Sequence, residues 1–151
     1  MALGVQAARP QAPVVSVIGD GGMLVHTSEL NVAAQRALPV LHVVVKNGLY
    51  KSVGERQKFF FGKYYNAEIE NPSYAKVAEA FGCRGFTARR ACEVRAAVRS
   101  WLADRQPAVL EVDVGFDSMM EGLPHVTAFT QQMFGAARRT DWPFPPLLAV
   151  R

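Results

Sequence analysis

Two short polar motifs carry residues that could bind a metal ion. Gly19-Asp20-Gly21-Gly22 offers a carboxylate beside flexible backbone, and Asn47-Gly48 offers an amide oxygen. Taken alone, Asp-Gly and Asn-Gly are ordinary turn dipeptides, so neither motif indicates a site. Brought together, a carboxylate and a neutral amide oxygen would suit a hard cation such as Mg²⁺, which prefers oxygen ligands.

The elements around the two motifs predict that they meet. Residues 13–19 are β-branched and almost continuously apolar, which is typical of a strand buried on both faces, and residues 40–45 have the same character. Apolar residues recur at helical spacing between them, after short polar residues that could cap a helix, namely Thr27, Ser28 and Glu29. In such a parallel βαβ unit both strands end at one edge of the sheet, where Asp20 and Asn47 should converge.

A diphosphate would complete this site. Mg²⁺ typically takes one or two protein carboxylates and fills its remaining positions with phosphate oxygens and water. Glycines allow backbone N–H groups to approach phosphate closely, and the positive end of the following helix would face it. We therefore expect residues 19–22 to form a loop that holds a metal-bound diphosphate.

The rest of the chain predicts more elements of an α/β fold. The first ten residues resemble the end of a helix, and residues 52–71 lack periodicity, so an irregular aromatic segment is expected there, either over an active site or at a packing contact. Helices are predicted from Asn71-Pro72-Ser73-Tyr74 to Gly82 and over residues 92–103, and a strand over residues 108–114. Together these elements predict a doubly wound parallel sheet with helices on both faces.

Composition narrows the classes of protein. The chain has 151 residues, of which 50% are hydrophobic and 20% charged, as in one compact domain. The net charge of +4 is scattered, so no nucleic-acid partner is expected. The apolar runs are strand-sized and the N-terminus lacks a basic leader, so we expect no membrane segment and a cytoplasmic location.

The spacing of the two motifs resembles the cofactor motif of thiamine diphosphate-dependent enzymes. Gly19-Asp20-Gly21 is separated from Asn47 by 25 residues (22–46), within Val-Ile-Gly-Asp-Gly-Gly-Met and Lys-Asn-Gly-Leu-Tyr. The similarity is to the acetolactate synthase and 2-oxo acid decarboxylase group, and it continues through residues 71–82 and 109–114. It implies a diphosphate-binding domain over residues 1–115, lacking its N-terminal part, with a tail over 116–151 packed on the domain or a partner.

The resemblance also implies roles for particular residues. Asp20 and Asn47 would bind Mg²⁺ through their side chains, and Leu49 through its backbone carbonyl. The implied cofactor-binding residues are Gly19, Asp20, Gly21, Gly22, Asn47, Leu49 and Tyr50. No catalytic residue is implied, because none of the glutamates can be given the activating role. Lys46 departs from the family, where a second asparagine is common, and we interpret His26 as a helix-cap residue.

The resemblance implies a partner chain or a missing upstream region. In the family the cofactor lies between a pyrimidine-binding domain and a diphosphate-binding domain, and this chain has room for the latter. We therefore expect a subunit or fragment of an enzyme that decarboxylates or carboligates 2-oxo acids, active in a hetero-oligomer with a pyrimidine-binding subunit.

Two alternatives stay open. Residues 47–57 have some likeness to sulfopyruvate and phosphonopyruvate decarboxylases, so the chain could be the small subunit of such a split enzyme. It could also be a non-catalytic structural subunit with a degenerate cofactor site. The acetolactate synthase-like interpretation ranks first because residues 71–82 fit it better.

Overall fold

The computed structural model describes residues 1–115, so the predicted role of the tail over 116–151 lies outside the described residues. Within residues 1–115 no helix is long and apolar enough to cross a bilayer. The elements, in chain order, are α1 (Ala2–Ala8), β1 (Val14–Gly19), α2 (Asp20–His26), α3 (Glu29–Gln35), β2 (Val40–Lys46), α4 (Lys51–Phe61), α5 (Tyr74–Ala80), β3 (Arg84–Ala88), α6 (Ala91–Ala103) and β4 (Ala108–Asp113).

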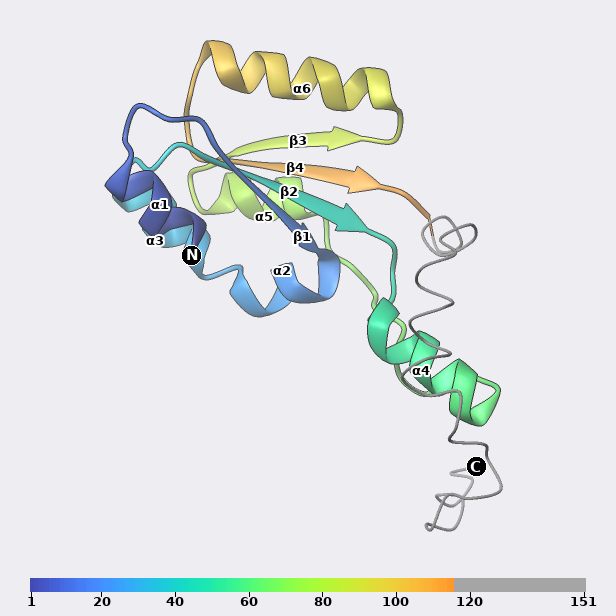
Figure 1. The fold of residues 1–151 in the computed structure, drawn as a ribbon. Helices are drawn as coiled ribbons and strands as arrows, with labels where there is room; N and C mark the ends of the chain where they lie inside the picture. Colours follow the sequence, from blue (N-terminus) through green and yellow to red (C-terminus); the bar gives the residue numbers. More distant parts are fainter. Residues whose placement is uncertain (116–151) are drawn as a thin grey trace.

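The strands form one parallel sheet in the order β1-β2-β4-β3, with helices on both faces (Figure 1). On one face, residues of α2, α3 and α5 pack around Val44 of β2 and Val109 of β4. On the other face, Trp101 of α6 packs with Leu41 and Leu110. The predicted α/β class is confirmed, and so are α5, α6 and β4, close to their predicted bounds.

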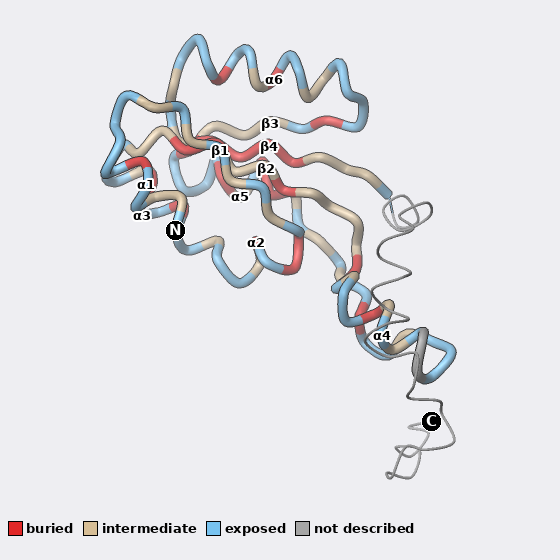
Figure 2. The backbone as a smooth tube through the Cα atoms, viewed as in Figure 1, coloured by how far each residue is buried: buried red, intermediate tan, exposed pale blue. Residues whose placement is uncertain are grey.

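The prediction that the first strand is buried on both faces is wrong for β1. Its residues alternate between intermediate and exposed, and Val15 and Val17 are 49% and 71% exposed. β1 is one of the two outer strands of the sheet, and α6 packs on β3 and β4 at the other side (Figure 2). An apolar, β-branched sequence therefore does not by itself separate an edge strand from a central one.

The segment after β1 is a helix and not the predicted loop. The chain turns from extended backbone at Gly19 directly into α2 at Asp20, so α2 is an additional helix, and the helix predicted to follow Thr27, Ser28 and Glu29 is α3. The capping prediction is also wrong, because Ser28 makes no side-chain cap hydrogen bond and the Thr27 hydroxyl donates to the Leu24 carbonyl (3.3 Å). His26 ends α2 and so does not stand at the cap of α3.

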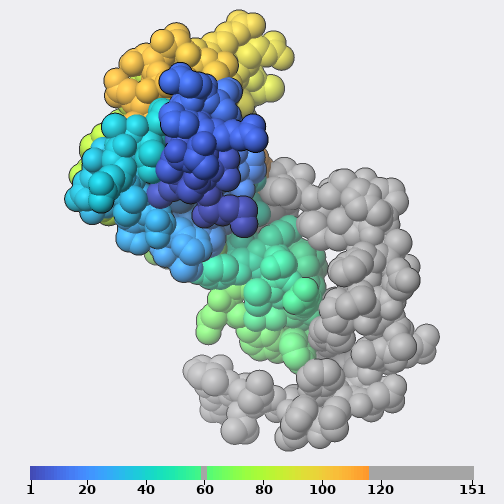
Figure 3. All heavy atoms as spheres, turned by 60° about the vertical axis from the view of Figure 1, so that its left-hand side comes forward, coloured from blue at the N-terminus to red at the C-terminus, as the bar shows by residue number. Residues whose placement is uncertain are grey.

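Residues 51–61 form α4 instead of the predicted irregular segment. This helix projects from the carboxyl edge of the sheet and covers neither face (Figures 1 and 3). The chain that returns from it is held to α4 by Gln57, whose side chain bonds both backbone groups of Tyr65 (2.9 Å each). The Tyr64 hydroxyl also donates to Glu55 (2.9 Å). Because α4 does not cover the sheet, it needs no apolar stripe, which explains the missing periodicity.

Candidate functional site

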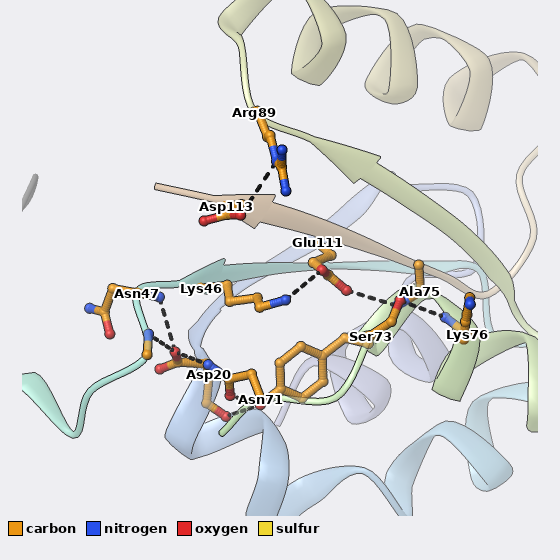
Figure 4. A network of polar contacts seen from close by, with 12 residues as sticks. Asp20, Lys46, Asn47, Asn71, Ser73, Ala75, Lys76, Arg89, Glu111 and Asp113 are labelled. Carbon is orange, nitrogen blue, oxygen red and sulfur yellow. Dashed lines mark hydrogen bonds and ion pairs between the residues drawn. The ribbon is translucent and has the colours of Figure 1, made fainter. Parts of the chain in front are cut away.

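The structure brings the two polar motifs together at the carboxyl edge of the sheet. β1 and β2 are adjacent and parallel, so Asp20 and Asn47 follow neighbouring strand ends. Asp20 is 2% exposed, and its Oδ2 accepts the backbone N–H groups of Asn47 (3.0 Å) and Gly48 (2.7 Å). Figure 4 shows these contacts, which realise the convergence that the βαβ pattern predicts.

The turn after β2 is held in one conformation. Gly48 has a φ of +73°, a left-handed conformation that favours glycine, and Asn47 Oδ1 accepts the N–H of Leu49 (3.0 Å). Leu49 is buried, and an antiparallel bridge joins it to Glu68. The bonds that flank the bridge run from Ile69 N to Gly48 O (2.8 Å) and from Tyr50 N to Ala67 O (2.7 Å). Neither of these two bonds uses the Leu49 carbonyl, the predicted third metal ligand.

Two residues outside the predicted set also hold Asp20. The Asn71 side chain donates through Nδ2 to Asp20 Oδ2 (2.7 Å). The Tyr74 hydroxyl is in hydrogen-bond contact with two acceptors, the Asp20 carbonyl (2.9 Å) and Asn71 Oδ1 (2.7 Å). Burial, and then the charges of Asp20 and Glu111, raise the pKa of Tyr74 above its usual value, so it stays a donor at neutral pH. The sequence predicts Asn71 and Tyr74 only as the start of a helix and does not relate them to Asp20.

The predicted glycines differ in their surroundings. Gly21 is buried and donates its N–H to Asp20 Oδ1 (2.9 Å), whereas Gly19 and Gly22 are exposed. A Cβ on Gly21 would lie 2.4 Å from Cε1 of Tyr50, so the Tyr50 ring lies directly against this glycine. The first turn of α2 and the turn after β2 therefore contact each other through Tyr50 as well as through Asp20.

Charge balance sets Asp20 apart. Within residues 1–115, no lysine, arginine or histidine forms an ion pair with it. Lys46, the residue that departs from the family, pairs instead with Glu111 (3.0 Å), whose other oxygen accepts the N–H of Ala75 (3.3 Å). N–H dipoles stabilise the Asp20 carboxylate without cancelling its charge, so its oxygens suit a hard cation.

The donor set is sparse for a metal held by protein alone. Within residues 1–115, no group of three or more His, Cys, Asp or Glu residues could hold a metal ion. A cation at Asp20 would therefore need the amide oxygen of Asn47, a backbone carbonyl and oxygens from a bound ligand. This composition fits Mg²⁺, which is commonly bound by one or two carboxylates together with phosphate oxygens.

The fold is that of a parallel α/β domain, and its buried Asp20 lies at the carboxyl ends of the strands, the edge at which such folds commonly bind ligands. Residues 1–112 match the family described as thiamine pyrophosphate enzyme, C-terminal TPP binding domain. The chain belongs to this family, which confirms the resemblance found in the sequence.

Relatives of known identity agree with this assignment. The chain is 30% identical over 126 residues to the mitochondrial acetolactate synthase catalytic subunit of Saccharomyces cerevisiae, covering 83% of this chain and 18% of that protein. It is 32% identical over 115 residues to the acetolactate synthase isozyme 2 large subunit of Escherichia coli, covering 75% of this chain and 21% of that protein. The chain thus spans about a fifth of the length of these relatives.

A solved structure also resembles this one. The thiamine diphosphate-dependent 4-hydroxybenzoylformate decarboxylase of Rhodococcus jostii RHA1 superposes with a TM-score of 0.72 at 30% sequence identity. The similarity covers 78% of this chain and 23% of that chain. The parallel sheet and its helices are therefore those of a domain found in a thiamine diphosphate enzyme.

Proposed function

We propose that this chain is the diphosphate-binding part of a thiamine diphosphate-dependent enzyme that acts on 2-oxo acids, as acetolactate synthase does. The observation that carries the proposal is the Asp20 carboxylate, which is buried beside Asn47 and stabilised by N–H groups without a basic partner in residues 1–115. Family membership supplies the chemical identity of the ligand.

In this proposal the chain binds the anionic end of the cofactor. Asp20 and Asn47 hold Mg²⁺ through side-chain oxygens, and Leu49 contributes its carbonyl. The diphosphate lies against residues 19–22, beside Tyr50. When bound, thiamine diphosphate supplies the electron-accepting centre at which a 2-oxo acid loses carbon dioxide. The residues of this chain neutralise the diphosphate and fix the position of the cofactor.

The proposal includes a partner chain that carries a pyrimidine-binding domain, in a hetero-oligomer. It is supported by the resemblance, which places the cofactor between a pyrimidine-binding domain and a diphosphate-binding domain of the kind that residues 1–112 match. A second candidate is decarboxylation without carboligation, which the name of the structural neighbour favours. The two reactions differ in product, because an aldehyde is released in one and an acyloin in the other.

Calorimetry of thiamine diphosphate binding tests the proposal. The full chain is titrated with and without Mg²⁺, alone and mixed with a candidate pyrimidine-domain protein. We expect binding that needs Mg²⁺, tightens with the partner, and is lost in Asp20→Ala but kept in Asp113→Ala, a carboxylate at the end of β4. Binding restored by a partner would be followed by a screen of 2-oxo acids, with aldehyde and acyloin measured separately.

Absence of binding in every combination would contradict the cofactor assignment. The chain would then be a structural subunit that keeps the motif without using it. Equal losses of binding in Asp20→Ala and Asp113→Ala would instead indicate a general effect on the fold, which far-UV circular dichroism of both variants would detect.

A further inference from the structure

The two carboxylate oxygens of Asp20 have unequal numbers of hydrogen-bond donors. Oδ2 accepts the N–H groups of Asn47 and Gly48 and the Asn71 side chain, at 3.0, 2.7 and 2.7 Å. Oδ1 accepts the Gly21 N–H at 2.9 Å. Since a carboxylate oxygen offers about two lone-pair sites, Oδ2 is fully used, whereas Oδ1 can accept another partner. Oδ1 is therefore the oxygen available to a cation.

The Asn71 donor differs from the others because it is a side-chain amide and not a backbone N–H group. The three backbone donors are fixed by α2 and by the turn after β2, whereas Asn71 reaches Asp20 from 51 residues away. Its Oδ1 faces the Tyr74 hydroxyl at 2.7 Å. If the amide were flipped, its oxygen would face Asp20 Oδ2, and two acceptors would then repel each other. The Asp20 carboxylate, which can only accept, therefore fixes the orientation in which Asn71 donates, and Tyr74 contacts the amide oxygen on its other side.

The segment that carries Asn71 is itself anchored (Figure 4). Ser73 caps α5, its hydroxyl accepting the N–H of Lys76 (3.4 Å), and the N–H of Ala75 donates to Glu111 (3.3 Å). Glu111 pairs with Lys46, the residue before Asn47. The start of α5 and the end of β2 are thus connected through Glu111 as well as through Asp20.

We propose that Asn71 is a positioning residue that, supported by its contact with Tyr74, holds Asp20 Oδ2 and leaves Oδ1 to the bound cation. This inference rests on the proposed function, because the cation is the one that Asp20 and Asn47 would share. Asn71 does not contact the cation. It acts through Asp20, as residues that hydrogen-bond a metal ligand do.

The Mg²⁺ dependence of thiamine diphosphate binding tests this role. The concentration of Mg²⁺ that gives half-maximal binding is measured for the full chain, with its partner present if binding requires one. We expect Asn71→Ala to raise that concentration about tenfold, the lower end of the usual effect of losing a residue that hydrogen-bonds a metal ligand. The matched control is Asn31→Ala on α3, an exposed asparagine whose side-chain oxygen accepts from the Gln35 side chain (3.4 Å), and it should stay within about twofold of wild type.

Two further variants of the same residue separate positioning from a general structural role. Asn71→Asp replaces the N–H donor by a carboxylate that repels Asp20, so Mg²⁺ binding should weaken at neutral pH. Asn71→Gln keeps an amide N–H donor, so Mg²⁺ binding should recover in part in Asn71→Gln and not in Asn71→Ala. Tighter Mg²⁺ binding by Asn71→Asp at neutral pH would overturn the proposal, because residue 71 would then act as a ligand.

Hydrogen exchange in the ligand-free chain distinguishes failure of this inference from failure of the proposed function. If wild type binds no cofactor, the proposed function fails, but the orientation of Asp20 can still be measured. Loss of Asn71 should speed exchange of the Gly48 amide several-fold and leave the amides within β2 unchanged. Tyr74→Phe, which keeps the ring, should have the same effect to a smaller extent. Unchanged Gly48 exchange in Asn71→Ala would overturn the positioning role.

Discussion

Acidic residues at the two halves of one sheet edge are stabilised in different ways. Beside β3 and β4 each carboxylate is paired with a base, whereas Asp20, between β1 and β2, is surrounded by N–H groups and has no ion pair within residues 1–115. A base cancels the charge of a carboxylate, but N–H dipoles only stabilise it. The ion pairs beside β3 and β4 are Glu111 with Lys46, Asp113 with Arg89, and Glu93 with Arg90.

This difference determines where a cation can bind. A cleft over the β3 and β4 half is lined by both members of two of these ion pairs, Lys46 with Glu111 and Arg89 with Asp113. Its negative charges are already matched by positive ones. At Asp20 the negative charge is unmatched, so an incoming cation gains the full attraction. The comparison therefore favours the β1 and β2 half as the metal site.

Replacing each acid by its amide tests the comparison most strongly. Asp20→Asn should lower the free energy of unfolding by about 3 kcal/mol, because an amide turns an NH₂ group toward backbone donors that now lack an acceptor. Asp113→Asn should lower it by less than about 1 kcal/mol, since its partner Arg89 has an 81% exposed side chain. Urea denaturation without Mg²⁺ measures both. Stabilisation by Asp20→Asn would show that the N–H groups do not offset burial of the charge.

The sequence predicts the convergence of Asp20 and Asn47 because one local unit produces it. Two strands and the helical segment between them form a right-handed parallel crossover, and this geometry needs no knowledge of the rest of the fold. Asn71 could not be predicted in the same way. Asn71 comes after α4 in the sequence, 51 positions from Asp20. Neither apolar periodicity nor motif spacing relates residues that lie so far apart in the chain.

Errors in the predicted elements have a similar origin. β1 is as apolar as a central strand, and its exposure follows from its place at the edge of the sheet. β3 was not predicted because Arg84, Gly85 and Thr87 interrupt its apolar character. Gly85 is explained only by its surroundings, since a Cβ there would lie 2.5 Å from the carbonyl oxygen of Ala75. Such requirements arise from packing between elements and leave little pattern within them.

A pair of glycine substitutions gives the second contrast. A Cβ on Gly85 meets the backbone of α5, while a Cβ on Gly21 meets the Tyr50 ring at 2.4 Å. Backbone cannot move without shifting α5, but Tyr50 is 41% exposed and its ring can turn toward solvent. We expect Gly85→Ala to lower the free energy of unfolding by about 2 kcal/mol and Gly21→Ala by less than about 1 kcal/mol. Thermal and urea unfolding of both variants measure the difference.

Equal losses in the two variants would mean that Tyr50 is fixed at the carboxyl edge of the sheet. Quenching of its ring NMR signals by a soluble paramagnetic agent adds an independent measurement, because a ring displaced from Gly21 should become more accessible in Gly21→Ala. Gly85→Ala should leave quenching of Tyr50 unchanged unless the fold is lost.

The smallest expected effect concerns Glu93, at the start of α6. Its carboxylate accepts the backbone N–H of Arg89 (2.8 Å), and the Arg90 side chain and backbone N–H (3.1 Å) also bond it. These bonds lower the pKa of Glu93 from 4.5 to about 2. Since the pKa is lower in the folded chain, Glu93 stabilises the fold fully above pH 4.5, and this contribution is lost as pH falls from 4.5 toward 2. Solvent exposure keeps the contribution small.

The carboxyl ¹³C shift of Glu93, followed against pH, measures this pKa directly. A midpoint near 2 is expected, and a midpoint near 4.5 would show that the bonds from Arg89 and Arg90 do not stabilise the Glu93 carboxylate. In Glu93→Gln the amides in the first turn of α6 should exchange faster at pH 6, with no further change linked to residue 93 on acidification. Because Glu93 is bonded by a guanidinium as well as by N–H groups, added Mg²⁺ should leave its titration unchanged. A Mg²⁺-dependent shift of that midpoint would mean that the β3 and β4 half also attracts cations, and the contrast with Asp20 would fail.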